Sequence, residues 1–233
     1  MARNRTTALE PGDTLAPLER ALIELGVAVS VTSLDRDAIE RAIVVALDAG
    51  ASAAQIQEIV SLVSGLGVHS LMASASAIIA AAANRGEDFS QAFDERQQQL
   101  WDNFVGDDHY WAAFEKAVPG FLDALVRLSP DQFEAFFIYC AVPWKNGAVR
   151  ARTKELTALA CDATPAHRFL PGFSLHLDNA IAIGVGRQAI METLDIAEAA
   201  PRHEGLRKND SFLTSQLHLS LHSGYEGKHA GGL

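Results

Sequence analysis

The spacing of the apolar residues constrains the fold most. They recur every three or four residues in 18–25, 39–47 and 56–63, which is the period of helices with one buried face. Gly50 and Ser52 follow as a helix C-terminal cap and the N-cap of the next helix. No run alternates as a half-buried strand does, and 48% apolar content with 7% aromatics indicates a core of Ala, Leu, Ile and Val. The sequence therefore predicts an all-α fold.

The chain is also similar to itself at a displacement of 134 residues. This shift pairs Leu22 with Leu156, Ala46 with Ala180, Gly50 with Gly184, Ile56 with Ile190 and Glu58 with Glu192. Such self-similarity predicts a degenerate tandem repeat. We expect a flexible N-terminal arm over 1–14, a first repeat over 15–90, a second repeat with the candidate active site over 91–200, and a C-terminal segment with a mobile tail over 201–233.

Two polar residues of the second repeat are the best candidates for catalysis. Glu155 and His176 lie 21 residues apart, on either side of a connection broken by Pro and Gly, so two helices could bring an acid and a base together. The first repeat has Ala21 and Ala42 at the equivalent positions. This difference predicts a structural first repeat and a chemically competent second one.

The segments that carry these residues resemble a known family. Residues 152–160, 176–184 and 190–197 resemble the core of the carboxymuconolactone decarboxylase family, which includes the AhpD-type alkylhydroperoxidases. Residues 42–67 resemble the second half of that core, and 105–109 and 144–147 resemble segments that precede it in the decarboxylase branch. The resemblance implies an AhpD-like helical fold and a homo-oligomer, here a trimer of tandem repeats.

The resemblance also separates two activities. In the peroxidase branch a Cys-x-x-Cys pair precedes the histidine, and the cysteine positions fall on Phe169 and Gly172 in this chain. Dithiol peroxidase chemistry needs a thiolate and a resolving thiol, so it is excluded. The decarboxylase branch also lacks the cysteines and is the closer relative, although it carries Arg-Ser where this chain has Lys154 and Glu155.

We therefore expect a cofactor-independent lyase that acts on a small carboxylated lactone or ring compound from aromatic or secondary metabolism. His176 would be the acid/base, and Glu155 would set its tautomer or relay the proton. The substrate-binding candidates are Arg152, Lys154, Trp144 and His109, with Arg150 as a further cation for the carboxylate. An isomerase or hydrolase on the same scaffold is an alternative.

Structural roles are the competing interpretation for each of these residues. Glu155 could be a surface charge and His176 a core histidine. The three cations 150, 152 and 154 could face solvent or a neighbouring subunit, Trp144 could be core or interface, and His109 could simply follow a capped helix start. A non-catalytic helical oligomer that binds a small ligand or partner is the corresponding second hypothesis.

Composition excludes several other classes. A net charge of −10 without a basic stripe argues against nucleic-acid binding. Cys140 and Cys161 are too few for a disulfide framework, and His218 and His222 lack further ligands, so we expect no metal and no cofactor. Residues 61–83 carry no charge, but their serines and glycines favour a helix buried in a packed assembly over a membrane span. No secretory signal is apparent, which predicts a cytoplasmic protein.

Overall fold

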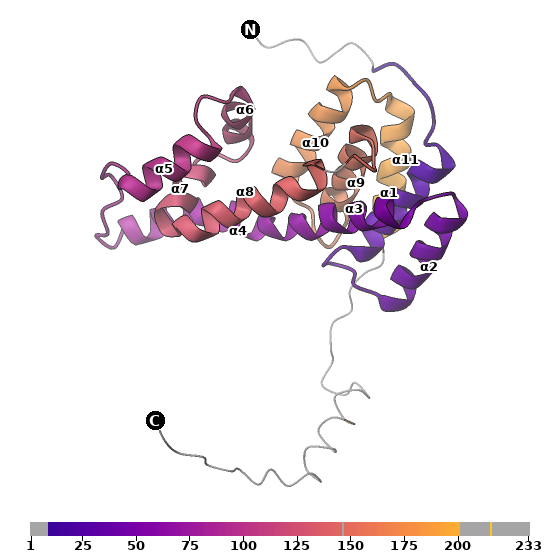
Figure 1. Cartoon of the computed structure of the whole chain (residues 1–233), viewed down its shortest axis with the longest axis horizontal. Coiled ribbons are helices and arrows are strands. Elements are labelled where there is room, and N and C mark those ends of the chain that lie inside the picture. Colours follow the sequence, from indigo (N-terminus) through magenta and orange to yellow (C-terminus); the bar gives the residue numbers. More distant parts are fainter. Residues whose placement is uncertain (1–8, 146, 201–214, 216–233) are drawn as a thin grey trace. The chain divides into compact units, whose positions relative to one another are not determined.

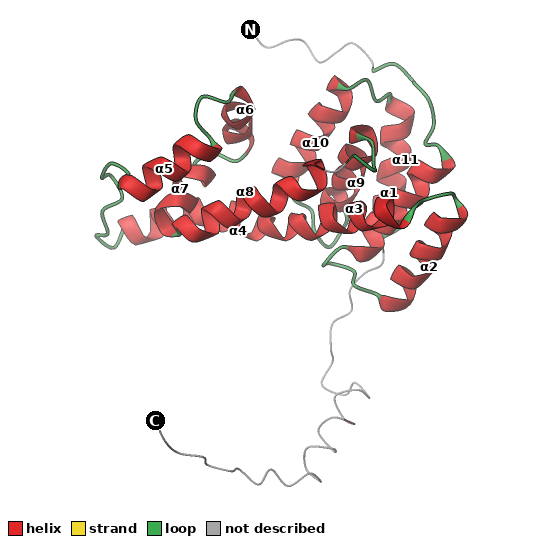
Figure 2. Cartoon of the chain, viewed as in Figure 1, coloured by secondary structure: helices red, strands yellow, loops and turns green. Residues whose placement is uncertain are grey.

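The computed structural model describes residues 9–145, 147–200 and 215, and every regular element in them is a helix (Figures 1 and 2). This confirms the all-α prediction. The chain divides into two units, Met1–Arg202 and His203–Leu233, and helices α1 to α11 belong to the first. Its elements are α1 (Pro17–Val29), α2 (Arg36–Asp48), α3 (Ala53–Gly65), η1 (Leu66–Val68), α4 (His69–Ala83), α5 (Glu95–Phe104), α6 (His109–Ala117), α7 (Phe121–Leu128), α8 (Pro130–Lys145), α9 (Ala151–Ala163), α10 (Leu170–Ala182) and α11 (Arg187–Glu198).

The first three helices recur near the end of this unit. α1, α2 and α3 begin at residues 17, 36 and 53, and α9, α10 and α11 begin at residues 151, 170 and 187. Each start lies 134 residues after its counterpart, and the ends of α9 and α10 keep the same displacement from those of α1 and α2. The helix boundaries thus follow the displacement found in the sequence.

The turns within the two sets have matching backbone geometry as well. Gly50 and Gly184, which follow α2 and α10, have φ of +94° and +87°, a conformation that favours glycine. Leu34 and Arg168, which precede the same two helices, have φ of +44° and +45°. Positive φ is uncommon for such side chains, so the agreement reflects a shared turn and not only shared helix propensity.

Two glutamates connect the sets reciprocally. Glu58 on α3 accepts backbone N–H groups at the entry to α9 and lies 2.5 Å from the Nζ of Lys154. Glu192 on α11 accepts a backbone N–H at the entry to α1 and pairs with Arg20 at 2.7 Å. Glu58 and Glu192, like Arg20 and Lys154, are related by the same displacement. The last helix of each set therefore contributes a glutamate that binds the N-terminal end of the first helix of the other set.

Helix α9 is the centre of this arrangement. It packs against α1, α3, α10 and α11, and every residue from Thr153 to Asp162 is buried (Figure 1). The core around it consists of Leu, Ile, Val and Ala side chains, such as Leu156 and Leu159, as the composition predicted. A helix buried on all sides places its polar residues inside the protein, where each needs a partner.

A second, aromatic core lies between the helices that pack around α8. Its buried members include Phe114, Phe121, Phe133 and Phe136, and α4 contributes Ala75 to it. The helices that build this core, α4 to α8, lie in the sequence between the two sets that recur. α4 precedes the predicted boundary near residue 90 and packs against α7, which follows it.

Residues 9–14 differ from the predicted flexible arm. The carbonyl oxygens of Glu10 and Pro11 accept the backbone N–H groups of Arg187 and Gln188, at 2.9 and 2.8 Å. The first N–H groups of a helix have no partner within the helix, and here a neighbouring segment supplies one. This segment is therefore fixed at the N-terminus of α11. Residues 1–8 lie outside the described range.

The apolar stretch around residues 61–83 is less buried than predicted. In the described part of the chain, Ala53–Ala83 is the one helical stretch that is long and apolar enough to cross a membrane, and 11% of its most apolar window is buried. Within α4 only His69 and Ala75 are buried, because one face alone packs against the aromatic core. A single chain does not enclose this helix. Helices in the core of a protein that does not cross a membrane can have the same length and composition.

Candidate active site

Glu155 and His176 meet in the structure. Glu155 lies on α9 and His176 on α10, and the Nδ1 atom of the imidazole is 2.7 Å from the Oε2 atom of the carboxylate. Asn179, one turn further along α10, donates from its side-chain amide to both carboxylate oxygens at 3.3 and 3.4 Å. Residues three apart lie on one face of a helix, which explains how a single helix presents both groups.

This hydrogen bond defines the state of the imidazole. A carboxylate can only accept, so the hydrogen between the two groups is carried by Nδ1 of His176. The side chains are 13% and 10% exposed, so little water competes for the bond. Nε2 makes no hydrogen bond to the residues that the structure describes. The ring is thereby oriented with one nitrogen left for proton exchange.

The pair lies in the wall of a cavity of about 580 Å³. Most of the lining is apolar and aromatic, and it comes from α3, η1, α4, α5, α6, α8 and α10. The aromatic members are Phe104, Tyr110, Trp111, Phe114, Phe136, Phe137, Trp144 and Phe169. Besides Glu155 and His176, the polar residues are few: His69, Asn179, Lys145 and, among the aromatic residues, Tyr110 and the two tryptophans. This size and composition are those of a site for a small organic molecule.

A second polar cluster adjoins the pair. His69, the first residue of α4, lines the cavity and lies near Asp162 of α9 and His167 of the turn that follows. Burial lowers the pKa of His69 to about 3, helped by the neighbouring His167, and burial also lowers the pKa of His167. Burial raises the pKa of Asp162 to about 7, against a smaller opposite effect of His176. Perturbed groups in a cavity wall are typical of functional sites.

One solved structure is similar to the chain in fold and in sequence. It is a crystal structure at 1.70 Å resolution of a protein from Burkholderia xenovorans LB400, provisionally named a gamma-carboxymuconolactone decarboxylase subunit. The identity is 30%, the TM-score is 0.66, and the match covers 78% of this chain and 70% of that one. The chain belongs to the carboxymuconolactone decarboxylase family. No family model and no curated protein matches the sequence.

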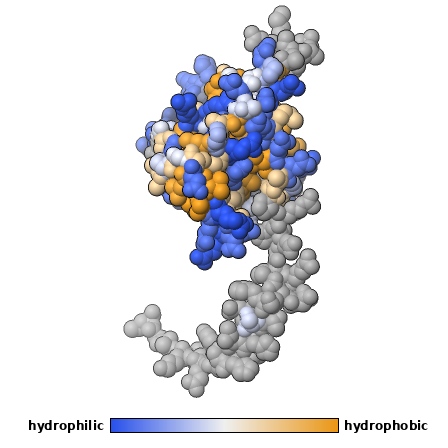
Figure 3. All heavy atoms as spheres, turned by 90° about the vertical axis from the view of Figure 1, so that its right-hand side faces the viewer, coloured by the Kyte–Doolittle hydropathy of each residue, from blue (hydrophilic) through white to orange (hydrophobic). Residues whose placement is uncertain are grey.

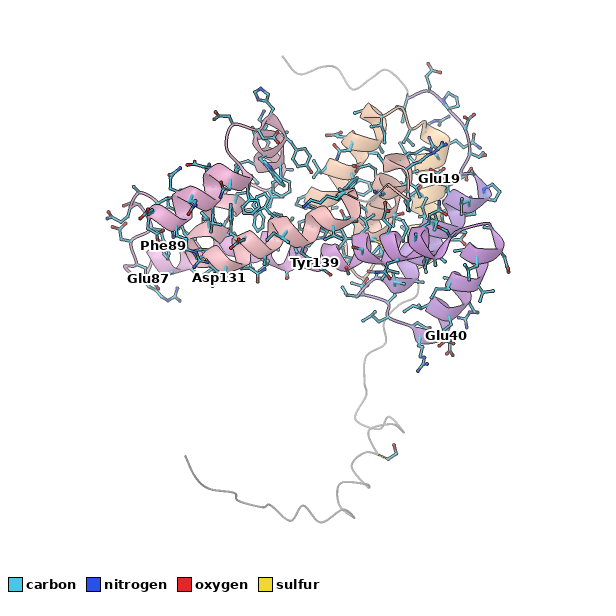
Figure 4. The ribbon with its side chains drawn as sticks, viewed as in Figure 1. Glu19, Glu40, Glu87, Phe89, Asp131 and Tyr139 are labelled. Carbon is cyan, nitrogen blue, oxygen red and sulfur yellow. The ribbon has the colours of Figure 1, made fainter. Side chains whose placement is uncertain are left out.

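Two of the residues predicted to bind the substrate do not line the cavity. The Nε atom of Arg152 donates to Glu19 at 2.9 Å, and Glu19 is labelled on α1 in Figure 4. The Nζ atom of Lys154 lies 2.5 Å from Glu58 and donates to the carbonyl oxygen of Pro143 at 2.6 Å. Both cations face the packing of α9 against other helices. Neither side chain is among those that line the cavity, and their contact with a substrate carboxylate stays a prediction.

The other two predicted binding residues differ from one another. Trp144, near the end of α8, lines the cavity and is 42% exposed. His109 is exposed at the start of α6, where Asp108 caps the helix, and it does not line the cavity. Its neighbour Tyr110 does. The helix that begins at His109 thus contributes to the cavity through its next residue, and spacing alone does not show which face of a short helix is turned inward.

The two positions that hold cysteines in the peroxidase branch of the family hold other residues in this chain. Phe169 and Gly172 both line the cavity. Burial raises the pKa of the Cys140 thiol to about 11 and also raises that of Cys161, so neither forms a thiolate readily.

Four further cavity or cluster residues were not identified in the sequence: His69, Asp162, His167 and Asn179. Asn179 could have been found from its position one turn after His176 on the same helix face. Asp162 and His167 follow Glu155 closely in sequence, but His69 is almost a hundred positions away, and no local pattern links it to them. His218 and His222, which the sequence analysis considered as metal ligands, lie outside the residues that the structure describes.

Proposed function

We propose that this protein is a lyase of the decarboxylase type that acts by general acid/base chemistry on a small carboxylated lactone or ring compound. The observation that carries the proposal is the 2.7 Å contact between His176 and Glu155 in the wall of an apolar cavity. Membership of the carboxymuconolactone decarboxylase family supports the same reaction class. The chain's relation to the decarboxylase branch in particular is part of this proposal.

The proposed reaction breaks one carbon–carbon bond. The electron pair of that bond moves into the conjugated carbonyl of the substrate as CO₂ leaves, and protonated His176 then transfers a proton from Nε2 to the carbon left behind. Glu155 holds Nδ1–H, orients the ring and stabilises the imidazolium before the transfer. The net change replaces a carboxylate with a hydrogen, and a proton from solvent restores the imidazolium.

The cavity suits such a substrate in size and polarity. Its aromatic walls would pack against a flat unsaturated ring, and the Tyr110 hydroxyl is a donor for a lactone or carboxylate oxygen. The charge of the leaving carboxylate is lost as neutral CO₂ forms, which an apolar enclosure favours. An isomerase or hydrolase would use the same pair with a different substrate.

We also infer that the chain is a tandem repeat in which only the second copy carries the acid/base pair, and that it assembles with further copies. The displacement of the helices supports the repeat. Exposed apolar residues, such as Val44 and Val45 on α2 and Ile138 on α8, support assembly. Figure 3 views the end that carries α2 and α11 and shows apolar surface beside charged residues. Light scattering after size exclusion would give the number of copies.

Turnover of a panel of carboxylated lactones and unsaturated ring acids would test the function. We expect CO₂ release and loss of substrate absorbance with the wild type, and a rate lower by about 10²–10⁴-fold in His176→Ala. Glu155→Gln keeps the shape of the side chain but removes its charge and should also be slow. Glu40→Gln, on the exposed surface of α2, is the matched control and should keep the wild-type rate.

Two outcomes would contradict the proposal. Equal rates in the wild type and His176→Ala would remove the histidine from the reaction. Saturable binding of the same compounds without turnover would instead identify a ligand-binding oligomer.

A further inference from the structure

The cluster beside the acid/base pair has the geometry of a metal site. The Nδ1 atom of His69 lies 2.8 Å from the Nε2 atom of His167, and the Oδ1 atom of Asp162 lies 3.4 and 3.6 Å from these two nitrogens. Two imidazole nitrogens and one carboxylate oxygen therefore converge on one point. Their residues come from the start of α4, the end of α9 and the turn after α9.

The size of this triangle matches metal coordination. The three distances define a circle on which the three atoms lie, with a radius of about 1.9 Å, and zinc binds imidazole nitrogen and carboxylate oxygen at about 2.0–2.2 Å. An ion slightly out of the plane of the three atoms would be at bonding distance from all of them.

Asp162 gives an independent reason to expect a cation. Its side chain is fully buried, and neither carboxylate oxygen accepts a hydrogen bond from the described residues. A buried polar group without a partner is costly, and a buried carboxylate is normally paired or bound to a metal. A hydrogen bond between His69 and His167 would account for their 2.8 Å separation but would leave both oxygens of Asp162 unsatisfied.

Residues 169 and 172 shape this cluster. The ring of Phe169 stacks on His69, with centroids 4.0 Å apart and an angle of 18° between the planes. A Cβ atom on Gly172 would lie 2.3 Å from the Oδ2 atom of Asp162, so any side chain there would displace the carboxylate. At the two positions where the family resemblance places cysteines, Phe169 therefore stacks against His69, and Gly172 leaves space for the carboxylate of Asp162.

We propose that His69, Asp162 and His167 bind one divalent transition-metal ion, with zinc as the reference metal. Two imidazoles and a carboxylate form a ligand set that suits such ions and leaves further coordination positions. His69 also lines the cavity, whereas Arg152 and Lys154 pair with glutamates elsewhere. The ion would add a positive charge for a substrate carboxylate to that of Lys145, which also lines the cavity; this role rests on the proposed function, whereas metal binding does not.

Metal titration of the full chain tests the site without any measurement of turnover. Protein treated with a chelator would be titrated with Zn²⁺ in a calorimeter and with Co²⁺ in a spectrophotometer. We expect one ion per chain and a visible Co²⁺ absorption of low-coordinate type. Asp162→Asn and His167→Gln should weaken binding by at least about 100-fold, since each removes a ligand. Asp37→Asn, on the exposed surface of α2, should bind as the wild type does.

A second variant protects the test against misfolding. His167 lies in a turn and its side chain is 16% exposed, so replacement there should be tolerated. His167→Cys offers zinc a thiolate and should regain binding that His167→Gln has lost. Absence of stoichiometric binding by the wild type, or equal binding by the wild type and all ligand variants, would overturn the site. Unchanged KM after removal of a bound ion would overturn only its role toward the carboxylate.

Discussion

The two sets of helices that recur in this protein have nearly the same backbone and different chemistry. α1 to α3 and α9 to α11 share their helix starts and the φ angles of their turns. The second set carries Glu155, Asp162, His167, His176 and Asn179 where the first has Ala21, Ala28, Ser33, Ala42 and Val45. Apolar packing and two glycines thus maintain the backbone in both sets. The polar groups vary without disturbing it.

The two sets of helices also differ in the size of the hollow beside them. A hollow of about 340 Å³ beside the first set is lined by Ile196, Ala199 and Ala200. These are the counterparts of Leu62, Gly65 and Leu66, which line the cavity of about 580 Å³ beside the second set. Only the second is completed by the aromatic helices α5, α6 and α8. The polar residues of one set and the aromatic helices between the sets therefore meet around the larger cavity alone.

Moving the histidine from one set to the other should give the largest effect. The double variant His176→Ala with Ala42→His should remain slower than the wild type by about 10²–10⁴-fold, because the transferred imidazole has no carboxylate at position 21 and no aromatic cavity. Initial rates on a turned-over substrate would measure this. Recovery of activity would show that the sets are chemically interchangeable.

The equivalent glutamates should differ in their contribution to stability. Glu58→Gln removes the carboxylate that pairs with Lys154, at a site where both side chains are almost fully buried, and breaking a buried ion pair costs about 3–5 kcal/mol. Glu192→Gln breaks a pair whose side chains are 41% and 20% exposed, and solvent screening reduces that cost to roughly 1 kcal/mol or less. Denaturant unfolding of both variants would compare them. Equal losses would mean that burial does not distinguish the pairs.

The pH dependence of stability should reveal the polar cluster of the second set. The pKa of Asp162 is raised to about 7 on folding, so its contribution is complete below its unfolded pKa and is lost as the pH rises through the folded value. The pKa of His69 is lowered to about 3, so stability rises with pH from that value toward 6.5. The two slopes oppose each other between about pH 4 and 6.5.

Asp162→Asn removes one of these slopes. In metal-free protein, we expect the free energy of unfolding of this variant to increase more steeply with pH than that of the wild type over that window. Chemical denaturation at several pH values would measure it. His69→Gln should change the slope in the opposite direction, and parallel profiles for all three proteins would contradict the coupling.

The two glycines that the sets share should show the smallest difference between the sets. Gly50→Ala and Gly184→Ala should each cost about 1–2 kcal/mol, because both residues have positive φ. A Cβ atom meets nothing within 4 Å at either position, so strain is the only cost and the two losses should agree closely. Thermal unfolding of the pair would check this. A clear difference would show that the turns are not equivalent.

The sequence predicted the helices, their displacement and the partners Glu155 and His176. These follow from short-range information: apolar spacing, glycine at a turn, and residues on two consecutive helices. The sequence did not show that Arg152 and Lys154 pair with glutamates, because a helix buried on every side turns its cations toward carboxylates of other helices. Their spacing along the chain is the same in either environment.

What the sequence determined by itself is therefore the helical class, the 134-residue displacement of the helices and the pairing of Glu155 with His176, since local periodicity and turn chemistry encode all three. Only the tertiary structure decided that an aromatic set of helices covers α9 to α11 and encloses a cavity. It also decided that His69 meets Asp162 and His167 across almost a hundred residues. The physical reason is that such contacts depend on which buried faces pack together, and this is settled by the whole core at once.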